Sequence, residues 1–237
     1  MSKPFQFKEF TIYQDKTAMK VGTDGVLLGA WVDLSDQPDS ILDIGTGTGL
    51  ISLQLAQKCN AMTIDALEIE PNAHEQAVEN FENSDWGDRL FCYHASLQEF
   101  VDEIDEKYDL IISNPPFYTD TFKSVEEKRA TARHTKTLSF EELLSATTKL
   151  LSPKGSCAFI IPFHEEDTFL AYAEENQLYP QRITRVKGNI KAIFKRSLLQ
   201  LSFTNTTSKM EELAIEIKRH IYTNEYKDLV KDFYLKM

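Results

Sequence analysis

The sequence predicts an α/β fold in which a mostly parallel sheet carries helices on both faces. Short apolar runs alternate with stretches of helical spacing from residue 40 to residue 161, and this alternation is typical of parallel strands joined by crossover helices. Two further strand-like runs, residues 182–187 and 197–203, are separated by a short basic connection. They predict an antiparallel hairpin that closes the sheet.

The strands of the parallel part are predicted where apolar residues run between polar segments. The run Leu110-Ile111-Ile112 is continuous, as expected for a strand that is covered on both faces. Residues 153–155, with the sequence Pro-Lys-Gly, predict a turn before the last of these strands. The expected strands are residues 40–44, 63–69, 90–94, 108–113 and 157–161.

Helices are expected in the segments that follow these strands, where apolar side chains recur on successive turns. Pro71 suits the first turn of one such helix. Ser139 and Glu142 have the spacing of a capping box, in which side chain and backbone satisfy each other at a helix N-terminus. The expected helices are residues 49–58, 71–83 and 140–151, and a last helix from about residue 224.

Composition restricts the class of protein. The chain has 237 residues, of which 42% are hydrophobic and 27% are charged, so it can bury a core and is not a disordered chain. Lys and Arg number 26 against 37 Asp and Glu, which gives a formal net charge of -11. Taken alone, this charge argues against a nucleic-acid partner, because polyanions favour basic proteins. Net charge does not describe how the charge is distributed, however.

Targeting and metal signals are absent from the sequence. No apolar run approaches the ~20 residues of a membrane helix, and residues 1–8 carry charge but no apolar signal core. The three cysteines, Cys59, Cys92 and Cys157, lie far apart and fit neither a disulfide framework nor a zinc site. We therefore expect a cytoplasmic protein with no membrane partner and no metal.

A glycine cluster follows the first predicted strand and opens a helix. Its pattern, Asp43-x-Gly45-Thr46-Gly47-x-Gly49, differs from the G-x-G-x-x-G of dinucleotide sites. Closely spaced glycines let the backbone approach a ligand, and doubly wound sheets bind ligands at this end of the strand. The carboxylate suits a ligand with cationic groups, and S-adenosylmethionine has two, an ammonium and a sulfonium. Alone, the cluster is equally compatible with a loop that binds nothing.

The next two strands end in polar residues that suit a ribose and an adenine. Glu68 and Glu70 follow the second strand, and Glu68 lies ~20 residues past the glycines, the interval at which an acidic residue accepts ribose hydroxyls. We favour Glu68, because Glu70 already begins the next helix. Ser96 follows the third strand, where many such sites have Asp. Its hydroxyl can still accept from an adenine amino group.

The fourth strand runs directly into Asn114-Pro115-Pro116-Phe117. Two prolines at a strand end are usually a terminator, but here they lie beside the predicted cofactor. The Asn114 side-chain oxygen and the Pro115 carbonyl can accept from both N–H bonds of an exocyclic amino group, which turns its lone pair toward a sulfonium methyl. Proline has no N–H to compete for these acceptors, and Phe117 offers a face for a flipped base.

The glycine cluster and the Asn-Pro-Pro-Phe tetrapeptide together resemble those of class I S-adenosylmethionine-dependent N-methyltransferases. Residues 19–31, Arg129, residues 132–133 and residues 232–235 are further similar to the bacterial family that methylates N6 of adenine 37 in tRNA1(Val). The resemblance covers nearly the whole chain. It implies a Rossmann-like, mostly parallel seven-stranded sheet with an antiparallel last strand, S-adenosyl-L-methionine as cofactor, and a tRNA substrate.

The resemblance also implies roles for the ends of the chain. In that family Lys20, Thr23 and Asp24 would lie over the cofactor. We therefore expect one methyltransferase domain over residues 1–237. Its parts would be an N-terminal segment, 1–39, that caps the cofactor site, a Rossmann-like core, 40–205, and a C-terminal extension, 206–237.

Charge distribution favours an RNA substrate despite the negative total. Residues 181–203 contain no acidic residue, whereas acidic residues predominate between residues 60 and 110. A charge run is often only a solvated face, but two basic clusters that flank the strand ends favour a phosphate-binding rim. His134 is equally compatible with a structural role. The candidate RNA-binding residues are Arg129, Arg133, His134, Lys187, Lys191, Lys195 and Arg196.

Other functions remain open at this stage. A release-factor glutamine N5-methyltransferase also uses Asn-Pro-Pro, but it carries a helical recognition domain for which residues 1–39 are too short. A ribosomal-RNA guanine N2-methyltransferase is harder to exclude, because Asn-Pro-Pro-Phe is common there. Outside the enzymes, a non-catalytic S-adenosylmethionine-binding RNA-binding protein has little reason to keep the tetrapeptide. The oligomeric state is left open.

Overall fold

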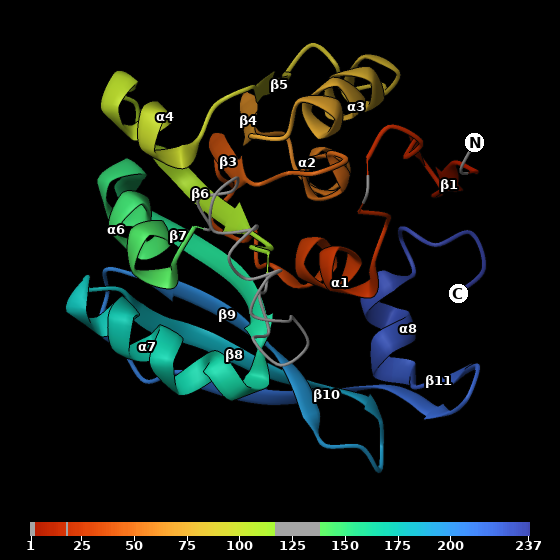
Figure 1. Cartoon of the computed structure of the whole chain (residues 1–237). Helices are drawn as coiled ribbons and strands as arrows, with labels where there is room; N and C mark the ends of the chain where they lie inside the picture. Colours follow the sequence, from red (N-terminus) through yellow and green to blue (C-terminus); the bar gives the residue numbers. More distant parts are fainter. Residues whose placement is uncertain (1–2, 18, 117–137) are drawn as a thin grey trace, which may run out of the picture.

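The computed structural model describes residues 3–17, 19–116 and 138–237. These residues form a nine-stranded sheet in the order β11-β10-β8-β9-β7-β6-β3-β4-β5 and a separate small hairpin of β1 and β2 (Figure 1). The strands are β1 (Phe5–Gln6), β2 (Thr11–Ile12), β3 (Ser40–Ile44), β4 (Thr63–Leu67), β5 (Leu90–Tyr93), β6 (Tyr108–Ser113), β7 (Leu151–Pro162), β8 (Tyr179–Asn189), β9 (Phe194–Ser202), β10 (Lys209–Lys218) and β11 (Ile221–Tyr222).

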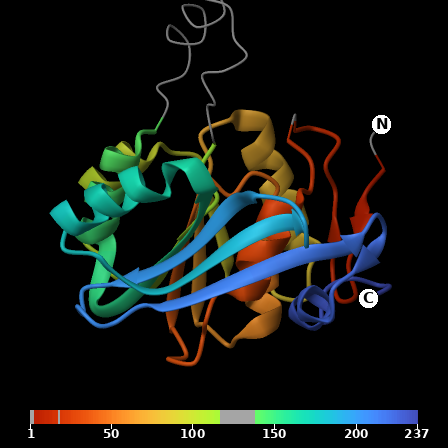
Figure 2. The ribbon, with the colours of Figure 1, turned by 90° about the horizontal axis from the view of Figure 1, so that it is seen from below.

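Helices cover both faces of the sheet, as Figures 1 and 2 show. One face carries α1 (Thr23–Trp31), α2 (Leu50–Lys58) and α3 (Pro71–Glu82), with α8 (Asn224–Val230) beside α1. The other face carries α4 (Leu97–Glu103), α6 (Phe140–Leu150) and α7 (Glu166–Glu175). The short 3-10 helix η1 (Phe163–Glu165) leads into α7. Each layer has its own buried apolar cluster, one with Leu53 and Trp31 and the other with Leu143 and Phe169. The sheet separates these two cores.

The fold class predicted from the sequence is confirmed. β3, β4, β5, β6 and β7 pair in parallel, and β9 pairs antiparallel with both β7 and β8. Seven strands, from β8 to β5, thus form the expected sheet. The described residues add β10, which pairs in parallel with β8, and β11 at the edge. No strand was expected in this segment.

One predicted turn is wrong. Residues 153–155 lie within β7 and not between two elements. The pairing with β6 shifts there, because Tyr108 faces Leu151 whereas Leu110 already faces Ser156. The Pro-Lys-Gly sequence therefore marks a bulge in a long strand, which is a place where proline and glycine are tolerated.

Three helices were not predicted from the sequence: α1, α4 and α7. The N-cap of α4 is Ser96, which forms a complete capping box with Glu99, the same pattern that correctly predicted α6 from Ser139 and Glu142. α1 contains Gly25 and is buried almost all round, so it shows no amphipathic period. No helix in the described part of the chain is long and apolar enough to cross a membrane.

The N-terminal segment is tied to the rest of the molecule at two places. The Phe7 backbone forms a bridge with Tyr234, and the Lys8 N–H donates to the Phe233 carbonyl over 2.9 Å. Further on, the buried Asn80 of α3 holds Tyr13 by two hydrogen bonds of 2.8 and 2.9 Å. The segment thereby leads across the carboxyl ends of the strands before it enters α1.

Candidate active site

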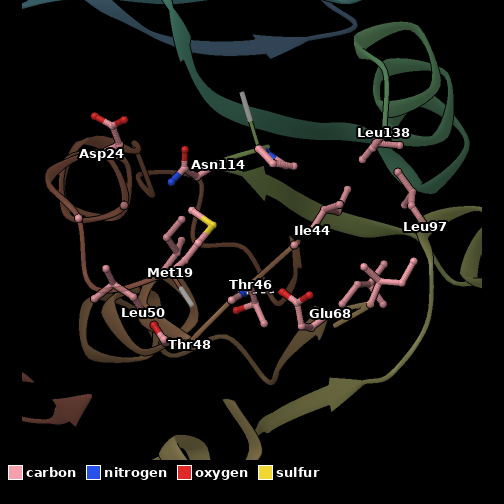
Figure 3. A pocket seen from close by; sticks show the side chains of 18 of the residues that line it. Met19, Asp24, Ile44, Thr46, Thr48, Leu50, Glu68, Leu97, Asn114 and Leu138 are labelled. Atoms are coloured by element: carbon pink, nitrogen blue, oxygen red, sulfur yellow. Dashed lines mark hydrogen bonds between the residues drawn. The ribbon is translucent and has the colours of Figure 1, made fainter. Parts of the chain in front are cut away.

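A cavity of about 590 Å³ lies at the carboxyl ends of the parallel strands (Figure 3). Its walls come from the ends of β3, β4 and β6, from the loop after β5, and from the segment that leads into α1. This is the edge of an open α/β sheet at which ligands bind. Of the predicted cofactor residues, those that line it are Lys20, Thr23, Asp24, Gly45, Thr46, Gly47, Glu68, Ser96 and Asn114.

The glycines after β3 have two different tasks. Gly45 and Gly47 have φ angles of 72° and 61°, and a Cβ on either would project into open space. They line the cavity, so their lack of a side chain leaves room for a ligand. Gly49 has a φ of 81°, and a Cβ there would lie 2.4 Å from a ring carbon of Phe81. It does not line the cavity and instead allows α3 to pack closely.

Asp43 lies behind the cavity wall and not in it. Its side chain is fully buried, and its Oδ2 accepts from the hydroxyls of Thr46 and Ser52, each over 2.7 Å. Burial raises the pKa of Asp43 to about 6, although both hydroxyls act in the opposite direction. The carboxylate therefore fixes the shape of the glycine loop, whereas the sequence pattern had suggested direct contact with a cationic ligand.

Glu68 and Glu70 are used differently, although both follow β4. Glu68 lines the cavity, and its two oxygens accept from the N–H groups of Gly47 and Glu70, each over 2.9 Å (Figure 3). Glu70 is the N-cap of α3 and accepts from the N–H groups of Asn72 and Ala73. Of the two glutamates, only Glu68 lines the cavity. Its contact with a ribose stays a prediction, for which Glu68 is favourably placed.

Ser96 lines the cavity, but its hydroxyl is engaged elsewhere. As the N-cap of α4 it donates to Glu99 Oε2 over 2.7 Å and accepts from the Glu99 N–H over 3.2 Å. A contact with adenine would therefore compete with a capping box. The neighbouring Ala95 is also part of the wall.

Asn114 follows β6 at the opposite side of the cavity from Glu68 (Figure 3). The end of β6 is fixed by Ser113, whose hydroxyl donates to the Ile44 carbonyl over 2.7 Å. Asn114 Oδ1 is buried and has no hydrogen-bond partner among the described residues. Buried acceptors without a partner are costly, so this oxygen is positioned for a donor that the described residues do not supply. Pro116 also lines the cavity, whereas Pro115 does not and Phe117 lies outside the described residues.

The segment before α1 forms part of the cavity wall, and polar side chains fix it there. Lys20 donates to the carbonyls of Gln14 and Thr17, so its ammonium holds the segment in a tight loop. Asp24 pairs with Arg196 over 2.7 Å. Asn80 was not identified from the sequence, yet it joins this segment to the glycine loop through the Thr48 carbonyl, over 2.8 Å. Its partners are distant in sequence, so no local pattern indicates the role.

The predicted RNA-binding residues fall into three groups. Arg129, Arg133 and His134 lie outside the described residues. Lys187 pairs with Glu212 over 3.2 Å, and Arg196 pairs with Asp24. Lys191 and Lys195 on the β8–β9 hairpin are exposed and have no ion-pair partner in the described ranges.

The residues present fit S-adenosylmethionine. Two glycines without side chains, a carboxylate and an unpartnered amide oxygen face one cavity. These are the features needed to approach a ligand closely, to accept from ribose hydroxyls and to accept from an amino group. Among the described residues, no group of three or more His, Cys, Asp or Glu side chains could hold a metal ion.

Comparisons with known proteins agree with this description. The family model "Methyltransferase small domain" matches residues 25–168. A protein of Christiangramia forsetii named tRNA1(Val) (adenine(37)-N6)-methyltransferase is 57% identical over 100% of this chain and 99% of its own length. Proteins of the same name are 59% identical in Flavobacterium johnsoniae, over 98% of this chain and 100% of theirs, and 46% identical in Parabacteroides distasonis, over 100% of both.

Solved structures support the fold. A predicted O-methyltransferase from Agrobacterium tumefaciens superposes with a TM-score of 0.68 at 18% identity, covering 89% of this chain and 96% of that one. A putative RNA methyltransferase from Pyrococcus horikoshii gives a TM-score of 0.53 at 16% identity, covering 75% and 80%. At such identities these likenesses concern the fold alone.

Proposed function

This chain belongs to the methyltransferase small domain family, and we propose that it transfers a methyl group from S-adenosylmethionine to N6 of adenine 37 in tRNA1(Val). Its full-length relatives carry that activity in their names. Within the structure, the observation that carries the proposal is the buried, unpartnered Asn114 Oδ1 at the wall of a cofactor-sized cavity. An acceptor of this kind suits an amino group presented by a substrate.

The chain's own residues would bind and align the two reactants. Glu68 would accept from the ribose hydroxyls, while Gly45 and Gly47 would let the backbone approach the cofactor. When bound, S-adenosylmethionine supplies a methyl group on a sulfonium. Asn114 Oδ1 and the Pro115 carbonyl would accept from the two N–H bonds of the adenine amino group and aim its lone pair at that methyl.

Methyl transfer of this kind needs alignment more than a base. The nitrogen forms the new bond to carbon as the bond from carbon to sulfur breaks, and the nitrogen then loses one proton to solvent. Its acidity rises as it bonds the methyl, so no strong general base is required. The rate enhancement would come from orientation and from the water-poor, preorganised acceptors.

We further propose the finer assignments that follow from the family. Residues 1–237 act as one catalytic unit, in which the segment 1–39 covers the cofactor and residues 206–237 extend the core. The tRNA meets the basic side of the β8–β9 hairpin, together with Arg129, Arg133 and His134, and Phe117 stacks on the flipped adenine. The reaction takes place in the cytoplasm.

Nucleoside analysis tests this function directly. The full chain is incubated with labelled S-adenosylmethionine and, separately, with bulk tRNA, ribosomal RNA and a release factor. We expect N6-methyladenosine at position 37 of tRNA1(Val). Label found as N2-methylguanosine in ribosomal RNA would favour a guanine N2-methyltransferase instead, and label found only in protein would contradict an RNA substrate.

A further inference from the structure

Two adjoining aromatic rings with a cation on either side lie where β7 and β8 end and β9 begins, close to the candidate active site. Lys187 Nζ lies 5.2 Å from the ring centre of Phe194. The rings of Phe194 and Phe163 are 5.3 Å apart and tilted by 53°. The Arg185 guanidinium carbon lies 5.4 Å from the Phe163 ring. We call Lys187, Phe194, Phe163 and Arg185 the aromatic row.

The two rings of the aromatic row are not part of the hydrophobic cores. Phe163 and Phe194 are half-exposed, and neither belongs to the apolar clusters on the two faces of the sheet nor to the partly buried residues that pack against them. They contact each other and two cations. Burial of apolar surface therefore explains little of their placement.

The cationic members of the row are held in place from behind. Arg185 Nε donates to both oxygens of Glu166, over 3.0 Å and 3.2 Å, and its Nη2 donates to Oε1 over 2.6 Å. The Glu166 side chain is only 4% exposed. That carboxylate also accepts from the Ser197 hydroxyl. Hydrogen bonding of this kind fixes the guanidinium plane beside Phe163, so the row presents a preorganised surface.

The aromatic row lies within reach of the reacting position. β6 and β7 run in parallel, and Ser113 faces Phe159, which places Asn114 level with Ile160. Phe163 follows three residues later, at the start of η1, so its Cα lies at most ~11 Å from that of Ile160. A nucleotide next to the one at Asn114 can span this distance.

On the β8–β9 hairpin the charge beside the row is suited to an RNA backbone, whereas Glu166 of α7 and Glu212 of β10 pair with the two cations of the row. Residues 181–203 contain no acidic residue. Lys191 and Lys195 are exposed and without an ion-pair partner in the described ranges. Single-stranded RNA is recognised by bases that stack on aromatic rings and guanidinium planes while cations follow the phosphates. The aromatic row and the two lysines supply both elements.

We propose that the aromatic row is a second base-binding site, which stacks a nucleobase of the single-stranded RNA loop next to the methylated adenine. This inference rests on the proposed function, because it takes the target adenine to lie at Asn114. It assigns to Phe163, Phe194 and Arg185 a substrate contact distinct from the cofactor cavity. The site would fix the position of the loop and would tolerate different bases, since every base has a stacking face.

The test is a binding cycle between protein and RNA variants. Dissociation constants are measured for the full chain and for Phe194→Leu, which keeps the apolar volume but removes the ring. The RNAs are an unmodified tRNA1(Val) transcript and transcripts with one abasic nucleotide on either side of the target adenine. Phe91→Leu is the control variant, because Phe91 is a solvent-accessible ring, 46% exposed, that lies on β5 at the far edge of the sheet.

We expect Phe194→Leu to weaken binding of the unmodified transcript by about tenfold, within the range known for one stacked base. One abasic transcript should bind the unaltered protein about tenfold more weakly and show no further loss with Phe194→Leu. Phe194→Trp, which keeps an aromatic ring, should bind the unmodified transcript as the unaltered protein does. Phe91→Leu should not change binding. Equal losses on all transcripts, or no loss, would overturn the stacking site.

The proposed function and this site can fail separately. If the unaltered protein methylates the transcript but all protein variants bind every RNA alike, only the stacking site is wrong. If the unaltered protein transfers no methyl group to adenine 37, both proposals are wrong. If Phe194→Leu does not fold, the affinities of the unaltered protein for the abasic transcripts still test the stacking site. Equal affinity for the abasic and the unmodified transcripts would contradict the proposal.

Discussion

The guanidinium of Arg196 on β9 donates to the carboxylate of Asp24 at the start of α1, with 2.7 Å between Nε and Oδ2. Asp24 lines the cavity proposed for the cofactor, and Arg196 belongs to the hairpin proposed to meet RNA. This ion pair thus joins the two proposed sites. Its partners are 172 positions apart in the chain, and both side chains are about one-third exposed.

Loss of this ion pair should weaken cofactor binding. We expect Arg196→Gln to raise the dissociation constant for S-adenosylmethionine by up to about fivefold, because a partly exposed pair contributes at most ~1 kcal/mol. Asp24→Asn should weaken it as well, and the double variant should be no weaker than Asp24→Asn alone. Calorimetric titration measures all three, with Lys195→Gln as the control. Strictly additive losses would mean that the two residues act independently.

Replacement of Asn114 should separate catalysis from cofactor binding. Asn114→Ala removes the unpartnered Oδ1 that we propose accepts from the adenine amino group, so we expect methyl transfer to fall by at least about a hundredfold, the scale of losing one preorganised group. Cofactor affinity should change by no more than a few-fold. Transfer of labelled methyl and calorimetric binding provide the two readouts. Retained activity would mean that the alignment mechanism is incorrect.

Two glycines in one loop should give opposite phenotypes. Gly49→Ala places a Cβ 2.4 Å from Phe81 at a φ of 81°, so we expect it to lower the free energy of unfolding by about 2–4 kcal/mol. Gly47→Ala meets no atom and should cost only about 1–2 kcal/mol, while its Cβ enters the cavity and weakens cofactor binding by about tenfold or more. Urea unfolding and calorimetry together separate the two effects. The reverse pattern would contradict the assignment of the cavity.

Lys191 and Lys195 should dominate the salt dependence of tRNA binding. We expect Lys191→Gln with Lys195→Gln to make the slope of log affinity against log salt shallower by about 1.4, the value for two contacts with single-strand phosphates. The matched control is Lys149→Gln with Lys154→Gln, two exposed lysines near the other end of β7. Filter binding over a range of salt concentrations gives both slopes. An unchanged slope would show that the hairpin is a passive face.

Acid should weaken the attachment of β10 to the sheet. Partial burial would raise the pKa of Glu211, but hydrogen bonds from Lys209, Arg182 and Thr184 outweigh it and lower the pKa to about 2. A carboxyl group whose pKa is lower in the folded state than in the unfolded state stabilises the folded protein at pH values above its unfolded pKa, about 4.5. This contribution to stability is lost as the pH falls toward 2.

Glu211→Gln should therefore be less stable than the unaltered protein at pH 7, and the difference should shrink below pH 4.5. Urea unfolding at several pH values measures it. Glu212→Gln is the control, because that neighbouring carboxylate is 62% exposed. A difference between Glu211→Gln and the unaltered protein that stays constant down to pH 3 would exclude linkage to this group.

Local patterns predicted much of the fold. β3 and β6 have the bounds expected from their apolar runs, and the capping box at Ser139 marks the start of α6 correctly. The hairpin of β8 and β9 was expected from its short connection. These successes share one cause, because each element is decided by residues that are neighbours in the sequence.

The elements that were missed depend on distant contacts. β10 contains Glu211, Glu212 and Glu216, which weaken a strand prediction, and it is stabilised by residues of β8 that pair with it across the sheet. α4 is an exception, since Ser96 and Glu99 form a capping box whose spacing is a local pattern in the sequence.

The candidate site was predictable to a similar extent. The glycine pattern and the tetrapeptide locate the cavity, but they do not reveal that Asp43 lies behind its wall. Nor do they indicate that Asn80 holds the N-terminal segment at Tyr13, or that Arg196 forms an ion pair with Asp24. Each of these facts joins residues from separate elements, and they become visible only when the chain is folded.

The contacts between the N-terminal segment and residues 231–234 have a consequence for how the molecule forms. Lys8 reaches the Lys231 carbonyl, 223 positions away, and such distant contacts form slowly during folding. While the chain is being synthesised, the N-terminal segment lacks one of its two attachments until α8 and the residues after it have emerged. Tight retention of the cofactor is therefore expected to be a late event in biogenesis, reached only after the sheet is nearly complete.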